Sequence, residues 1–234
     1  MNEDQIESQF AARQQSDLKW YAWQKARIAE LMKGVLAGNL DQAFKLASVL
    51  DHRERGQMVV KLYKSQVPTA AFAEVLKEAW TMNHWSVTQA AGSRTRLIDL
   101  FKYAQFELPD SLPQDVEVWR GVGADVSLRT AARGFAWSTS RSVAAWYALR
   151  FYASRNGLLL RATVHKSHVL FFDNDRQEEE VVLSEAPKNV NIDGTPADWH
   201  RWAAQHAGSV KAKSGVSGAT SLGEVVSTTP SRSG

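Results

Sequence analysis

The chain has 234 residues, of which 44% are hydrophobic and 23% are charged, and its formal net charge is +3. This composition indicates a globular protein with room for one large domain, or for one domain with an appended lobe. The absence of cysteine excludes disulfide bonds, thiolate metal sites and cysteine nucleophiles.

The charge pattern limits the classes of partner. The chain is only mildly basic and has no arginine- or lysine-rich cluster, which gives a nucleic-acid partner little support. No apolar run is long enough to span a bilayer, and the first ten residues are polar and acidic. We therefore expect a cytoplasmic protein without a membrane partner.

The first hundred residues carry apolar side chains at helical spacing and predict an N-terminal helical lobe over 1–107. Asn39 is the expected N-cap of one helix, with Gln42 in the capping-box position. Pro68 marks the first turn of another helix, and Pro109 closes the last one. The apolar faces expected in the core of this lobe are Ile28, Leu31, Met32, Val35, Leu36, Leu40, Ala43, Phe44, Ala47, Leu50, Phe72, Val75, Leu76, Ala79, Trp80, Leu97, Leu100 and Phe101.

One aromatic stretch of the lobe allows two interpretations. The segment Leu18 to Lys25, LKWYAWQK, could form a surface for a partner. Burial of Trp20 and Trp23 within the lobe is the interpretation we favour, because large aromatic side chains dominate protein cores.

The pattern changes at Asp115, where apolar residues begin to alternate as in strands and predict a strand-rich core over 108–206. A helix over Ser142 to Tyr152 interrupts the strands. The expected strands are Val116 to Trp119, Phe135 to Ser140, Leu158 to Val164, Val169 to Phe172 and Glu180 to Leu183.

The end of the chain predicts a turn, a helix and a tail. The turn covers Asn191 to Gly194, and Asp198 is the expected cap of a last helix that ends at His206. From there on glycine, serine and threonine dominate. Such a segment buries too little apolar surface to offset its ordering entropy, so we expect 207–234 to be disordered.

Three consecutive acids, Glu178, Glu179 and Glu180, run directly into the apolar strand that follows. On a strand, Glu178 and Glu180 share one face and Glu179 points to the other. A charge run of this kind is ordinarily a solvated turn, because desolvating an unpaired carboxylate is costly. A chemical role therefore depends on what lies elsewhere in the chain.

Two further motifs lie upstream of these acids. Arg120 with Gly121 ends the first strand, and Ser138-Thr139-Ser140 lies between a strand and a helix. Taken in this order, the motifs from about Leu97 to Leu183 resemble the cholera-toxin-like mono-ADP-ribosyltransferases, the Arg, Ser-Thr-Ser, Glu-x-Glu class. The small phage- and bacterium-encoded members are the most similar in character. The resemblance implies an α+β fold in which two small antiparallel sheets form an NAD cleft, beside a helical lobe.

The resemblance also implies a substrate and roles for the residues that touch it. NAD cleavage passes through an oxocarbenium-like ribose, and Glu180 would stabilise that cation. Arg120 would pair with an NAD phosphate, for which a permanently charged, planar guanidinium is suited. Gly121 would let the backbone pass close to the ligand. No metal is implied.

The remaining motif residues would complete the pocket and receive the acceptor. Ser138 would hydrogen-bond and orient Glu180, with Thr139 and Ser140 bracing the pocket wall. Glu178 would engage the acceptor, a protein of the host cell, and glutamate at this position goes with arginine acceptors. A carboxylate binds a guanidinium bidentately, which gives this preference a physical basis.

The chain departs from the family pattern at two places. Gln177-Glu178-Glu179 also fits a Gln-x-Glu motif with Glu179 as catalytic acid, but the catalytic acid of the family directly precedes the apolar strand, as Glu180 does here. The loop Asp173 to Gln177 lacks the aromatic residue that often contributes to recognition of the target protein. The identity of the target therefore stays open.

Other functions have weaker support in the sequence. An NAD glycohydrolase would need only the role of Glu180, so that Glu178 argues against it. A non-catalytic helical interaction module is suggested by the tryptophan-rich lobe. His165 and His168 have metal-like spacing, but no carboxylate is placed to complete a site, and we interpret them as structural.

Overall fold

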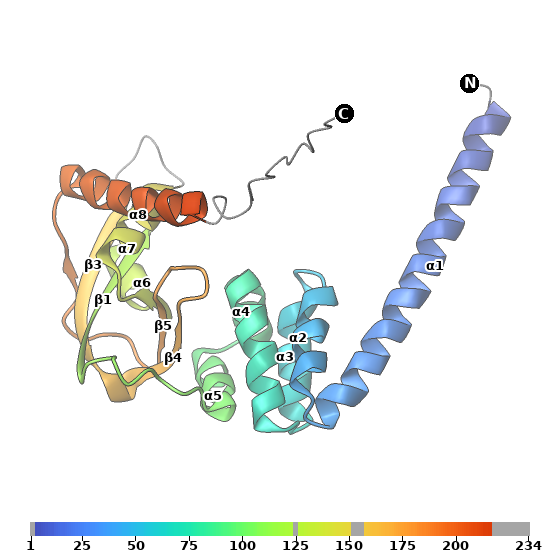
Figure 1. Cartoon of the computed structure of the whole chain (residues 1–234), viewed down its shortest axis with the longest axis horizontal. Coiled ribbons are helices and arrows are strands. Elements are labelled where there is room, and N and C mark those ends of the chain that lie inside the picture. The colour runs from blue at the N-terminus through green and yellow to red at the C-terminus, as the bar shows by residue number, and fades with distance from the viewer. Residues whose placement is uncertain (1–2, 124–125, 151–156, 217–234) are drawn as a thin grey trace, which may run out of the picture. The chain divides into compact units, whose positions relative to one another are not determined.

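The computed structural model describes residues 3–123, 126–150 and 157–216, and the chain divides into two compact units, Met1–Pro109 and Asp110–Gly234. The boundary lies two residues from the one expected between the helical lobe and the strand-rich core. The architecture is α+β, with five helices in the first unit and a six-stranded antiparallel sheet with helices in the second (Figure 1). Among the described residues, no helix is both long and apolar enough to cross a membrane.

The first unit is built from the expected helices and one that the sequence did not predict, α3. Asn39 caps the second helix as predicted, because its side-chain oxygen accepts a hydrogen bond from the Gln42 N–H at 3.0 Å. Pro68 directly precedes α4. The helices are α1 (Glu3–Leu36), α2 (Leu40–Val49), α3 (Glu54–Lys64), α4 (Thr69–Ala91) and α5 (Arg94–Ala104).

The predicted core faces of α4 and α5 are confirmed, because the eight residues expected there are all buried. The predicted face of α2 is partly wrong. Leu40 and Phe44 are exposed, whereas Leu46 is buried together with Ala43 and Ala47. Both sets fit the helical period, and α2 turns the second of them toward α1 and α4.

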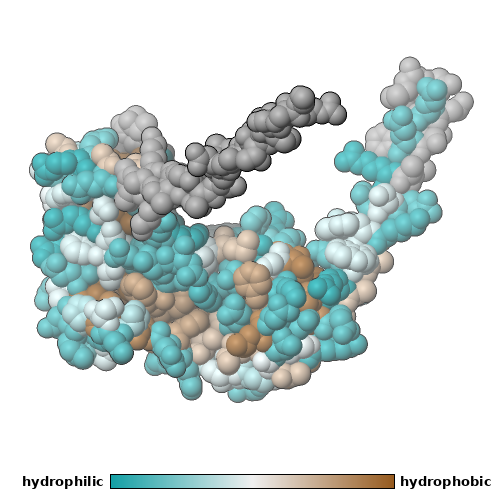
Figure 2. Space-filling model, in the orientation of Figure 1, coloured by the Kyte–Doolittle hydropathy of each residue, from teal (hydrophilic) through white to brown (hydrophobic). Residues whose placement is uncertain are grey.

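The expected burial of Trp20 and Trp23 is wrong. Their exposed fractions are 53% and 61%, and Tyr21 between them is 63% exposed. Among the residues of helix α1 whose burial the structure describes, Leu31 and Val35 are buried, and α2 packs against this helix. Leu36, which was expected in the core, is 51% exposed. Figure 2 shows that the surface of the helical unit carries both hydrophobic and hydrophilic patches.

The second unit contains every predicted strand, in the spatial order β4-β5-β2-β1-β3-β6, and all neighbouring strands pair antiparallel. Two predictions need correction: β2 is shorter than expected, and the predicted turn near Asn191 begins with a short strand, β6. The strands are β1 (Asp115–Val122), β2 (Ala136–Ser138), β3 (Leu158–His165), β4 (Val169–Asp173), β5 (Glu180–Leu183) and β6 (Asn191–Ile192). The helices are α6 (Leu128–Ala132), α7 (Arg141–Arg150), the 3₁₀ helix η1 (Lys166–His168) and α8 (Pro196–Val216).

Helix α8 differs from its prediction at both ends. Asp198 is not the N-cap: its N–H donates to Thr195 Oγ1 at 3.4 Å, while its Oδ2 accepts the Thr195 N–H at 3.0 Å. This is the reciprocal pattern of a capping box. The helix continues to Val216, so the predicted disorder is wrong for 207–216, where propagating a formed helix costs little. The rest of the predicted tail, 217–234, lies outside the described residues.

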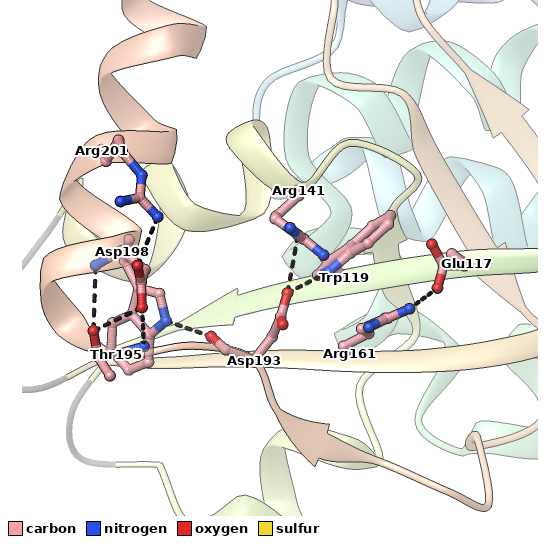
Figure 3. A network of polar contacts seen from close by, with 9 residues as sticks. Glu117, Trp119, Arg141, Arg161, Asp193, Thr195, Asp198 and Arg201 are labelled. Atoms are coloured by element: carbon pink, nitrogen blue, oxygen red, sulfur yellow. Dashed lines mark hydrogen bonds and ion pairs between the residues drawn. The ribbon is translucent and has the colours of Figure 1, made fainter.

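Helices α7 and α8 are fastened to the sheet at Asp193 (Figure 3). Its Oδ2 accepts the Trp119 indole N–H at 2.7 Å and lies 3.1 Å from Arg141 Nε, at the start of α7. Its backbone oxygen accepts the indole N–H of Trp199, on α8, at 2.5 Å. The Arg141 guanidinium also lies over the Trp202 ring, 4.6 Å from its centre. Asp193, the residue directly after β6, thus connects β1, α7 and α8.

Replacing Asp193 with alanine is expected to lower the free energy of unfolding by about 1–3 kcal/mol, because Trp119 and Arg141 lose a shared, mostly buried acceptor. Urea denaturation followed by tryptophan fluorescence measures the change. The matched control is Glu117→Ala, which breaks the exposed pair with Arg161 and should cost about 0–1 kcal/mol. Equal losses in the two variants would contradict the anchoring role.

Candidate active site

Three neighbouring strands bring the three sequence motifs together. Ser138 on β2 pairs with Trp119 on β1 at one side and with Glu180 on β5 at the other. Arg120 directly follows Trp119 on β1, so it lies one position away from the row of the sheet that holds Trp119, Ser138 and Glu180. The sequence predicted this grouping through the resemblance, and the strand order supplies its geometric reason.

The row lies where the sheet is weakest. Within the described residues, the pair Trp119–Ser138 is the one register pair that joins β1 to β2. The strands β4, β5 and β2 form one half of the sheet, and β1, β3 and β6 form the other. Where two strands diverge after a single pair, some of their backbone N–H and C=O groups make no hydrogen bond within the sheet. A side chain can then bind these groups.

Arg120 lies at this parting point. Its Nη1 donates a hydrogen bond to the carbonyl oxygen of Ala136 on β2, and its Nε is buried without a hydrogen-bond partner. The guanidinium lies against Gly134, where an added Cβ would come within 2.2 Å of Arg120 Cζ. Burial lowers the pKa of Arg120 to about 10, while the nearby Glu180 carboxylate acts in the opposite direction. The side chain therefore remains a cation at neutral pH.

Ser138 acts on the backbone before β5. Its hydroxyl donates to the carbonyl oxygen of Glu178 at 2.7 Å and accepts the Ser140 N–H at 2.9 Å. A hydroxyl has a single proton, which is used here, so the expected direct donation to the Glu180 side chain is corrected. Ser138 holds the chain two residues before Glu180.

The neighbouring Thr139 extends this junction. Its N–H donates to the Glu179 carbonyl and its hydroxyl donates to Glu179 Oε2, both at 2.9 Å. Glu179, to which the sequence assigned no role, thus has a structural one. Its φ is +45°, in the left-handed region, and β5 begins only at the next residue. Strand alternation is therefore not the reason for the placement of Glu178.

Glu178 and Glu180 nevertheless meet at a common partner. Arg176 Nη2 lies 2.7 Å from Glu178 Oε2 and 3.9 Å from Glu180 Oε2. The Tyr147 hydroxyl, on α7, donates to the other Glu178 oxygen, Oε1, at 2.7 Å. Burial, and then the contact with Glu178, raise the pKa of Tyr147, so it remains a hydrogen-bond donor. Glu180 itself is buried, with 9% exposed.

Gly121 is required by packing of α7. An added Cβ would lie 1.9 Å from the Ala144 carbonyl oxygen and 2.5 Å from the Ala148 N, both on α7. The helix following Ser140 therefore rests directly on β1. The expected close approach of a ligand to Gly121 stays a prediction.

Three residues of the site were missed by the sequence reasoning: Tyr147, Arg176 and Asp173. Asp173 is buried and pairs across the strands with Glu180. The sequence pattern that could have identified Asp173 is the alternation along β4, in which Val169, Phe171 and Asp173 are the buried positions. Tyr147 and Arg176 had no such signal, because only the fold brings α7 and the loop before β5 to the same carboxylate.

The histidine pair predicted to be structural has local partners. His165 Nδ1 lies 2.8 Å from Ser167 Oγ, and His168 Nδ1 lies 3.7 Å from Glu185 Oε1. Across the described part of the chain, no cluster of three or more histidine, cysteine or acidic side chains could hold a metal ion.

Removing the Tyr147 hydroxyl tests whether it positions Glu178. For the transferase activity that the family resemblance implies, we expect Tyr147→Phe to lower transfer to a guanidine acceptor by about 10-fold, since a hydrogen bond to a charged group contributes on the order of 1.5–3 kcal/mol. NAD hydrolysis should change little, and both rates follow from nicotinamide release with and without agmatine. The control Tyr103→Phe removes a hydroxyl that bonds to the Val67 carbonyl in the helical unit. Equal losses of transfer in the two variants would count against the positioning role.

Comparisons with known proteins identify no relative of this chain: no family model, no curated protein and no solved structure matches.

Proposed function

We propose that this chain is an NAD-dependent mono-ADP-ribosyltransferase that modifies an arginine of a host-cell protein and releases nicotinamide. The observation that carries the proposal is the placement of Arg120, Ser138 and Glu180 on three adjacent strands. Among the described residues, the two halves of the six-stranded sheet join through the single register pair Trp119–Ser138, and this narrow junction supports the NAD cleft between two small sheets that the family resemblance implies.

The charges of the site suit each part of NAD. Arg120 would supply a fixed cation for the pyrophosphate. Its Nε, which has no hydrogen-bond partner within the protein, would donate a hydrogen bond to a phosphate oxygen. Glu180, buried at the start of β5, would face the ribose as positive charge develops on it. Glu178 would accept the proton that the acceptor guanidinium loses as its nitrogen bonds to C1′ of the ribose and nicotinamide leaves.

Incubation with NAD labelled in its adenylate part, with and without a bacterial cell extract, tests the proposal. Transfer of label to protein, together with release of nicotinamide, is the expected result. Nicotinamide release without any transfer, even to agmatine, would instead favour an NAD glycohydrolase. If neither occurs and calorimetry detects no NAD binding at millimolar concentration, the enzyme proposal fails.

One observation favours a second role. Leu18, Trp20, Tyr21 and Trp23 are all more than half exposed on α1, which is unusual for so many large apolar side chains in one stretch. A helical interaction module therefore remains the alternative for the first unit. Failure of NAD to bind, with retained binding of an extract protein that Trp20→Ala abolishes, would favour it.

A further inference from the structure

The geometry points to Arg176 as an acceptor of the protein's own reaction: the chain modifies itself, by attaching ADP-ribose to this guanidinium. Arg176 lies in the loop between β4 and β5 and belongs to no motif of the family resemblance. Its Nη2 donates to Glu178 Oε2 at 2.7 Å and lies 3.9 Å from Glu180 Oε2. These are the two carboxylates to which the acceptor and the ribose are assigned.

The loop is folded so that Arg176 returns over these acids. The Gln177 N–H donates to the Asn174 carbonyl at 2.9 Å, which closes a turn, and Gln177 has a φ of +59°. The side chain of Asn174 also accepts the Glu179 N–H at 3.3 Å. The turn therefore places a guanidinium where an arginine of another protein would bind, at a high effective concentration.

Arg176 differs in this respect from other arginines of the unit. Arg141 pairs with Asp193, Arg161 with Glu117 and Arg201 with Asp198, none of which has a role in the proposed reaction. Arg176 and Arg161 have the same side-chain exposure, 44%, and each is paired with a carboxylate. The two differ in which carboxylate they face, which makes Arg161 a matched control.

The chemical step balances without a further reactant. The bond between C1′ of the ribose and nicotinamide breaks, and nicotinamide leaves with the bonding electron pair. A lone pair of Nη2 forms the new bond to C1′, and the proton released from Nη2 passes to Glu178 and then to water. Glu178 already holds this nitrogen by a hydrogen bond, so the proton has a direct acceptor.

The purified full-length chain is incubated with NAD alone, and its intact mass and tryptic peptides are measured. We expect one added ADP-ribose per chain, on the peptide that contains Arg176, and no addition in Arg176→Lys or Glu180→Ala. The control Arg161→Lys should be modified as fast as the wild type. Modification on another residue, or an unmodified Arg176 in a chain that transfers ADP-ribose to agmatine, would overturn the assignment.

This modification depends on the transferase function proposed above. That function is measured separately, by the release of nicotinamide. If the wild type releases none, the proposed function itself has failed; if it releases nicotinamide but Arg176 stays unmodified, only the self-modification has failed. A mixture of Glu180→Ala as acceptor and the wild-type chain as catalyst, told apart by their intact masses, tests whether the reaction is intramolecular. The Glu180→Ala chain should remain unmodified, and its modification would contradict a reaction within one chain.

Discussion

Replacing Glu180 with glutamine is expected to lower NAD cleavage by about 10²–10³-fold, which is the range for removing one group that stabilises transition-state charge. The amide keeps the size of the side chain but cannot carry the negative charge that would face the ribose cation. Because Glu180 is buried and acts on Arg120, the variant also leaves that cation with less compensation. Nicotinamide release at saturating NAD measures the loss, and thermal unfolding checks that the variant is folded.

The control for this prediction is the neighbouring acid. Glu179→Gln retains a side-chain oxygen that can accept the Thr139 hydroxyl, so the junction between β2 and β5 should survive. Most of the activity is expected to remain in this variant. Wild-type rates in Glu180→Gln, or equal losses in the two variants, would show that Glu180, at the start of β5, is not the acid that faces the ribose.

Replacing Glu178 with glutamine should separate transfer from hydrolysis. We expect transfer to agmatine to fall by about 10²-fold, the lower end of the range for a general base, while hydrolysis of NAD by water persists. The separation follows from the contacts: Glu178 is held by Tyr147 and Arg176 outside the strand, whereas Glu180 begins β5. The ratio of ADP-ribosylagmatine to free ADP-ribose, measured by chromatography, reports it.

Two outcomes would contradict this division of roles. If Glu178→Gln and Glu180→Gln lose hydrolysis equally, both acids act on NAD cleavage. If Glu178→Gln transfers normally, the acceptor is activated by another group. Glu185→Gln, which changes an exposed acid beside His168, serves as the control for loss of a negative charge from the same unit.

Local patterns in the sequence predicted most of the secondary structure. The Asn39 cap, the buried faces of α4 and α5 and five of the six strands depend on neighbouring residues and on periodicity, which the sequence displays directly. The errors arose where two faces fit one period, as in α2, or where the cover of a helix depends on other elements, as at Trp20. Helix α3 was missed altogether.

For the candidate site, too, some features were predicted from the sequence and others were decided only by the fold. By itself the sequence determined the motif residues Arg120, Ser138 and Glu180, because their types and order carry the resemblance. Only the tertiary structure decided that Ser138 binds the backbone at Glu178, and that Tyr147 and Arg176 share the carboxylate of Glu178. These contacts depend on which strands become neighbours and on a left-handed turn before β5. A pattern of residue types records neither, since both arise from packing between segments far apart in the chain.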